Sequence, residues 1–167
     1  MEDQLEQKLA AELKQAHRRA TMIGIVLIVG LFLYAYVMLI IVREFAPFTG
    51  FIALPMIDLL RYVLLAMAVA QLFVARLIQK SILSSKVFAR AMIFQRQPFS
   101  QPIQKLFNAS TFPLAICEAI VIYGLMLFLM AGNTSDYFIF AGLFLLGFAI
   151  YFPRYRQWEQ WVIQLKK

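Results

Sequence analysis

Four long runs of apolar residues divide the chain, and polar segments separate them. The runs cover about residues 21–42, 59–78, 112–131 and 137–152. A helix needs about 20 apolar residues to cross the hydrocarbon core of a bilayer, and the first three runs reach that length while the fourth is short. The pattern predicts an all-α, polytopic membrane protein with about four transmembrane helices.

The polar segment before the first run has its own period. In residues 1–20, Leu5, Leu9 and Leu13 recur at helical spacing among charged residues. This spacing gives a helix one apolar face. We expect a cytoplasmic amphipathic helix over residues 1–20 that lies on the membrane or on a partner.

The segment after the fourth run is basic and aromatic. Residues 154–167 contain Trp158 and Trp161 together with four Lys and Arg residues. Tryptophan and basic residues are typical of segments at the membrane–water interface. We expect an interfacial helix there, with the two tryptophans as interface anchors, and assign residues 21–153 to a four-span membrane domain.

Composition and charge agree with this division. The chain is 62% hydrophobic and 15% charged, with a mean hydropathy of +0.74 and a net charge of +7. When Arg61 and Arg76, near the two ends of the second run, are counted with the adjoining polar segments, the numbers of Lys and Arg in the five segments are four, two, six, none and four. By the positive-inside rule, both termini and the middle loop are cytoplasmic, and we expect a multi-pass protein of the cell inner membrane. The basic residues flank apolar spans, so no nucleic-acid partner is expected.

One carboxylate falls inside an apolar run. Glu118 lies near the middle of the third span, and Gln71 is the strongly polar residue at similar depth in the second. An ionised, unpaired carboxylate in lipid is costly, so Glu118 is expected to be protonated or paired, with Gln71 as its natural partner. A proton-handling role and a packing role, in which a protonated Glu118 hydrogen-bonds a neighbouring helix, both remain open.

The residues around Glu118 carry a family resemblance. The segment from Ile116 to Leu125 reads ICEAIVIYGL, and the segment from Ala66 to Gln71 reads AMAVAQ. With the Arg96-Gln97-Pro98 sequence between them, residues of about 60–132 resemble the hairpin of the c subunit (proteolipid) of rotary ATP synthases.

The resemblance implies that Glu118 is an ion-carrying carboxylate, with Gln71 and Tyr123 as hydrogen-bonding neighbours. It also implies that Arg96, Gln97 and Pro98 form a cytoplasmic polar loop. The family's sodium-type members have a hydroxyl residue just after the glutamate, where this chain has Ala119. The resemblance therefore favours protons.

The chain departs from the family pattern in three ways. Alanines replace the glycines of the first hairpin helix, the connection between Gln71 and Arg96 is about a dozen residues longer, and further spans flank the hairpin. Small residues let membrane helices approach closely, so these changes put a tight ring in doubt.

Two functions follow. The first is a c-like membrane subunit that binds or translocates protons through Glu118, and the second is a structural or assembly protein of a membrane complex. In either case the partners are the lipid bilayer and other membrane subunits or copies of the chain. An enzyme is the least favoured class, because no His cluster, paired carboxylates or nucleophile with a base is present at usable spacing, and no cofactor or metal site is expected.

The remaining polar residues have simpler interpretations. His17 sits beside two arginines and is expected to be a surface residue. Asp58 and Arg61 are three apart on one helix face and are expected to pair at the outer membrane boundary. Cys117 is expected to be a packing residue.

Overall fold

In the computed structural model, the described residues are 2–51, 56–84 and 99–165, and they contain helices and no strands. Four of these helices are long and apolar enough to cross a membrane. The expected all-α fold with four candidate spans is therefore confirmed for this part of the chain. The helices are α1 (Glu2–Glu44), α2 (Ile57–Ser84), α4 (Gln101–Ala131), α5 (Thr134–Tyr151) and α6 (Tyr155–Leu165).

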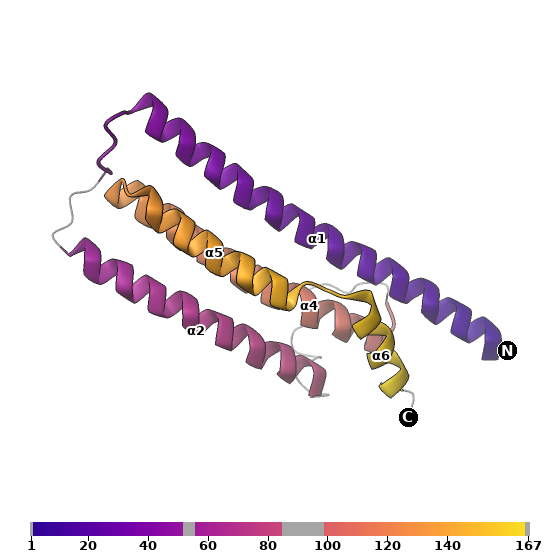
Figure 1. Cartoon of the computed structure of the whole chain (residues 1–167). Coiled ribbons are helices and arrows are strands. Elements are labelled where there is room, and N and C mark those ends of the chain that lie inside the picture. Colours follow the sequence, from indigo (N-terminus) through magenta and orange to yellow (C-terminus); the bar gives the residue numbers. More distant parts are fainter. Residues whose placement is uncertain (1, 52–55, 85–98, 166–167) are drawn as a thin grey trace.

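Helix α4 forms the centre of the bundle. It contacts α1, α2 and α5, while α1 and α2 lie on opposite sides of the α4–α5 pair (Figure 1). In the most apolar stretches of α4 and α5, 39% of the residues are buried inside the protein. In those of α1 and α2, the share of buried residues is 11%. The outer two helices therefore turn most of their apolar surface outward.

The first helix is longer than expected. Residues 2–44 form one helix, so the predicted amphipathic helix over residues 1–20 does not end before the first span. At 1.5 Å per residue, α1 is about 65 Å long, roughly twice the hydrocarbon thickness of a bilayer. No proline interrupts residues 2–44, and nothing local therefore ends the helix at residue 20.

The polar half of α1 packs against the rest of the protein. Its buried residues Leu13, Ala16 and Ala20 join a cluster with the start of α4 and with Trp158 of α6. Trp158 is 1% exposed, so the expectation that it anchors the membrane interface is wrong. The apolar face of the segment finds its partner within the same chain.

Helices α2 and α4 both extend beyond the predicted spans. Helix α2 continues to Ser84, and α4 begins at Gln101 rather than near residue 112. Pro102 occupies one of the first two positions of α4, where its missing N–H leaves no hydrogen bond unmade. The helices thus continue into the stretch that was expected to be a polar loop.

A two-residue turn joins α4 to α5. Gly132 has a φ of 71° and closes α4, a left-handed conformation that glycine adopts without steric cost. Asn133 follows as the N-cap of α5, and its side-chain oxygen accepts a hydrogen bond of 3.0 Å from the Ser135 N–H. This turn makes the two central helices antiparallel neighbours.

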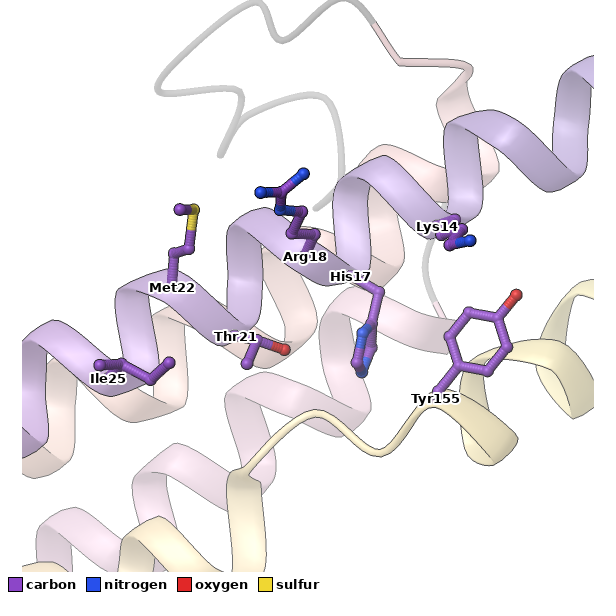
Figure 2. A pocket seen from close by; sticks show the side chains of 7 residues that line it. All are labelled: Lys14, His17, Arg18, Thr21, Met22, Ile25 and Tyr155. Atoms are coloured by element: carbon purple, nitrogen blue, oxygen red, sulfur yellow. The ribbon is translucent and has the colours of Figure 1, made fainter.

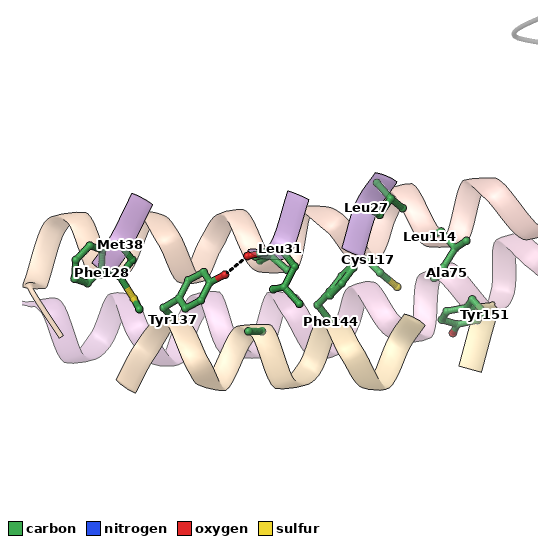
Figure 3. Packing of buried hydrophobic residues seen from close by; sticks show 12 residues of the cluster. Leu27, Leu31, Met38, Ala75, Leu114, Cys117, Phe128, Tyr137, Phe144 and Tyr151 are labelled. Carbon is green, nitrogen blue, oxygen red and sulfur yellow. Dashed lines mark hydrogen bonds between the residues drawn. The ribbon is translucent and has the colours of Figure 1, made fainter. Parts of the chain in front are cut away.

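Two tyrosines fix α5 between the outer helices. The Tyr137 hydroxyl donates to the Leu31 carbonyl of α1 at 2.7 Å (Figure 3). The Tyr151 hydroxyl donates to the Leu72 carbonyl of α2, also at 2.7 Å. Each hydroxyl reaches a backbone acceptor, which satisfies a polar group that would be costly to bury alone.

Candidate functional site

Glu118 lies on the side of α4 that faces α1. It is half-buried, and a Cβ placed on Gly30 of α1 would be 3.8 Å from its Oε1. Leu114 and Val121, one turn before and one turn after Glu118, belong to the apolar cluster shared with α1 and α5. The carboxyl group therefore sits in the α1–α4 seam, where Gly30 leaves space beside it.

The Glu118 carboxylate has no hydrogen bond or ion pair with any residue that the structure describes. It lies 13 residues before the end of α4, a distance of about 20 Å along the helix axis. Of the two expected states, protonated or paired, the paired one is therefore not seen with any described residue.

Gln71 and Tyr123 meet on the other side of α4. The Gln71 side chain donates from Nε2 to the Tyr123 hydroxyl at 2.7 Å. The Gln71 Oε1 is buried and has no partner among the described residues. The pair joins α2 to α4 by one interhelical hydrogen bond, and the Gln71 Oε1 remains an acceptor without a described donor.

The structure brings two of the three predicted site residues together and leaves the third apart. Tyr123 is five residues after Glu118, which turns it about 140° around the helix. Gln71 bonds Tyr123 and not Glu118, so the expected pairing of Gln71 with Glu118 is absent. Ion binding by the three residues stays a prediction. The predicted polar loop Arg96, Gln97 and Pro98 lies outside the described residues.

An ion-pair network ties α2 to α5. Arg61 binds Asp136 in a bidentate way, with Nε to Oδ1 at 2.7 Å and Nη2 to Oδ2 at 3.0 Å. Its Nη1 also donates to Asp58 Oδ1 at 2.6 Å, which confirms the predicted Asp58–Arg61 pair. Asp136 is 2% exposed, so two charge-assisted hydrogen bonds compensate its burial.

Asp136 was missed as a partner, because it falls in the polar segment just before the fourth apolar run. A signal was present, because an acid at the start of the fourth span lies on the same predicted side of the membrane as Arg61. Pairing the charges of each side with one another would have found it.

His17 is a fixed residue and not a free surface residue. Its Nε2 is 3.0 Å from the Pro153 carbonyl oxygen, so this nitrogen carries a proton and donates. The Tyr155 and Trp158 rings pack edge-on against it, with centroids at 5.2 and 5.5 Å. Burial and Glu159 raise the pKa of the Tyr155 hydroxyl, which keeps that ring neutral. His17 is therefore a half-buried residue near the surface, and its ring is held by contacts with the segment that begins α6.

Two further searches for functional signals, one for a metal site among the described residues and one for similar proteins, gave no result. No group of three or more His, Cys, Asp or Glu side chains is placed to hold a metal ion in the part of the chain that is described. Comparisons with models of protein families, with curated proteins and with solved structures found no match. The resemblance to the c subunit therefore rests on the sequence motifs alone.

Proposed function

We propose that this chain is a multi-pass protein of the cell inner membrane in which Glu118 binds and releases a proton. Its outward surface supports insertion into a bilayer. Large apolar side chains that are more than half exposed follow both outer helices and would be in contact with lipid. On α1 they include Val26, Val29, Phe32, Leu33 and Tyr36, and on α2 they include Leu59, Tyr62, Phe73 and Leu77.

The charges support the proposed orientation. Both termini lie at one end of the bundle, together with the basic residues of α6 and the basic ends of α1 and α2 (Figure 1). At the opposite end, Arg43 and Arg61 are accompanied by Glu44, Asp58 and Asp136. An excess of Lys and Arg on the cytoplasmic side sets the orientation of membrane proteins, so the end that contains the termini is cytoplasmic.

The unpaired carboxyl group of Glu118 supports the proton-binding role most directly. With no cation or hydrogen-bond donor among the described residues to stabilise its charged form, a carboxylate within the span costs a few kcal/mol. Protonation removes that cost, and ionisation becomes favourable again where water reaches the group. A carboxyl group in this setting can carry a proton without a cofactor.

Gly30 supports this role because it has no side chain to fill the space beside Glu118. A side chain at this position would lie against Glu118, and the glycine leaves the α1 side of the carboxyl group open. The carboxyl group is also only half-buried, so it can be reached from the outer surface of the bundle. Proton exchange needs such access, either to water or to a polar group on a partner subunit.

The c-like motif sharpens the proposal. Helices α2 and α4, which carry Gln71 and Glu118, pack side by side as the two helices of a c hairpin do. The proton is favoured over sodium, because Ala119 offers no hydroxyl ligand next to the glutamate. On this basis the chain works inside a larger membrane complex, with other subunits or with further copies of itself.

A structural or assembly protein is the second candidate, and the α2–α4–α5 contacts favour it. Gln71 donates to Tyr123 and Arg61 pairs with Asp136, so these polar groups hold helices together and do not surround Glu118. In that case Glu118 is a protonated packing residue, and transport is absent.

Proton flux into proteoliposomes separates the two candidates. The purified protein is reconstituted into liposomes, either alone or together with the membrane proteins that co-purify with it. A pH-sensitive dye inside the liposomes reports the proton flux. We expect Glu118→Gln to abolish flux and Tyr123→Phe to reduce it only slightly, with both variants folded. Full flux in the Glu118→Gln variant would refute the transport role and leave the structural one.

A further inference from the structure

A groove of about 670 Å³ runs along α1 beside the start of α6, at the end of the bundle that holds both termini. His17 and Tyr155 face each other across the space between the two helices (Figure 2). Arg18, the charged lining residue nearest to the proposed proton site, precedes Gly30 by 12 residues, about 18 Å along the axis of α1. The charged part of the groove is therefore separate from Glu118.

The outer end of the groove is cationic. Lys14 and Arg18 both line it and are exposed, and their spacing of four residues puts them on the same face of α1. Neither forms an ion pair with a described residue, and no carboxylate is among the groove's lining residues in the described part of the chain. Two positive charges thus lie at the border of the groove without a counterion from these residues.

The inner end of the groove is apolar. Met22 and Ile25 line the groove on the side nearer the middle of α1, and each is 55% exposed. Arg18 and Ile25 are seven residues apart, about 10 Å along the helix axis. The lining of the groove therefore changes from cationic to apolar over about the depth of a lipid headgroup region.

The floor of the groove holds a polar group without a partner. The Thr21 hydroxyl oxygen is buried and makes no hydrogen bond to any described residue. Thr21 lies between the cationic and the apolar end of the groove. A buried hydroxyl without a partner is costly, and rotation of the Thr21 side chain toward the groove would bring it within reach of a ligand oxygen.

We propose that this groove binds an anionic phospholipid of the cytoplasmic leaflet. The phosphate lies between Lys14 and Arg18, an ester oxygen accepts from the Thr21 hydroxyl, and an acyl chain covers Met22 and Ile25. The assignment rests on the proposed membrane insertion and orientation, and it is independent of the role of Glu118. Anionic lipids enrich at basic protein surfaces next to a span, by about 1 kcal/mol for each Lys or Arg.

Native mass spectrometry of the full chain in detergent tests the site. The protein is titrated with phosphatidylglycerol, with phosphatidylcholine of the same acyl chains, and with inorganic phosphate. We expect one phosphatidylglycerol per chain to bind more tightly than phosphatidylcholine. Lys14→Gln with Arg18→Gln should weaken phosphatidylglycerol about 30-fold, which corresponds to about 2 kcal/mol.

The chain offers a matched control. Arg76 and Lys80 are also four residues apart, exposed and at the cytoplasmic end of a helix, but they lie on α2 outside the groove. Arg76→Gln with Lys80→Gln should leave the affinity within about twofold, and exchange of the groove cations (Lys14→Arg with Arg18→Lys) should keep binding. Retained binding in that exchange also shows that substitution at these two positions is compatible with folding.

Three results would overturn the proposal. Equal losses from the two pairs of glutamine variants would show non-specific attraction to a basic protein. Equal binding of phosphatidylcholine would remove the role of headgroup charge, and displacement of the lipid by inorganic phosphate would show a free-phosphate site. Failure of membrane insertion is seen separately, because the protein would then stay in solution without detergent. Loss of proton flux with Glu118→Gln bears on the other site only.

Discussion

Helix α4 packs against α2 on one side and against α1 on the other, and the polar side chains that it presents to them, Tyr123 and Glu118, differ in their contacts. On the α2 side, Gln71 donates to Tyr123, and Arg61 of the same helix pairs with Asp136 of α5. On the α1 side, Glu118 has no partner among the described residues, and Gly30 leaves space beside it. The difference indicates that polar groups of the α2 seam hold the helices together, whereas the carboxyl group of the α1 seam stays available.

Packing follows the same division. Gly147 of α5 lies so close to the α2 seam that a Cβ there would be 2.8 Å from both Cys117 Sγ and Leu72 Cδ2. At Gly30 a Cβ would meet the Glu118 Oε1 at 3.8 Å, an ordinary contact. Helices α2, α4 and α5 therefore form a tight unit, and α1 near Glu118 is packed less closely.

The largest effect is expected at the ion-pair network. Asp136→Asn removes the charge that compensates Arg61 and should lower the free energy of unfolding by about 3 kcal/mol, because a partly buried guanidinium loses its main partner. Asp58→Asn is the control, since Asp58 is exposed and its loss should cost less than about 1 kcal/mol. Thermal or denaturant unfolding in detergent measures both. Equal losses of stability in the two variants would show that the buried Asp136–Arg61 pair does not stabilise the protein.

The next effect compares the two glycines. Gly147→Ala should be less stable than Gly30→Ala by about 1–2 kcal/mol, because the added methyl group overpacks only the first site. The gain in helix propensity is common to both changes and cancels in the difference. Unfolding of the two variants side by side is the measurement. A Gly30→Ala variant as unstable as Gly147→Ala would remove the contrast in packing.

A smaller effect is expected from the hydrogen bond of the α2 seam. Tyr123→Phe leaves the Gln71 amide without its acceptor and should cost about 0.5–1 kcal/mol, the range of polar contacts between membrane helices. Gln71→Leu with Tyr123→Phe should recover part of that loss, because no donor is then left unpaired. If the double variant is no more stable than Tyr123→Phe alone, the bond is not the source of the effect.

The smallest stability effect should come from the residue with the proposed function. Glu118→Gln is expected to change the free energy of unfolding by less than about 0.5 kcal/mol, since Glu118 has no described partner to lose. The unfolding experiment used for Tyr123→Phe applies. A loss of about 2 kcal/mol or more would mean that Glu118 is a structural group, and it would place the α1 seam in the same class as the α2 seam.

The sequence predicts the four long helices well because each of them contains a long run of apolar residues. The candidate spans and the Asp58–Arg61 pair depend on such local rules and were found. The boundary at residue 20 was missed because polar residues do not end a helix unless a breaker follows. The start of α4 was missed because α4 continues through Pro113, the residue next to the predicted start of the third span. The partners of Asp136 and His17, and the side of α4 on which Glu118 lies, depend on how distant segments pack, and no local pattern encodes them.

Labelling with a hydrophobic carbodiimide tests the central claim, because the reagent modifies protonated carboxyl groups that can be reached from an apolar phase. Purified protein is labelled at neutral pH, and the sites are mapped by mass spectrometry. The account predicts selective modification of Glu118, while Asp136, buried and paired with Arg61, stays unmodified. Modification of Asp136 alone, or of neither residue, would contradict a protonated and accessible Glu118.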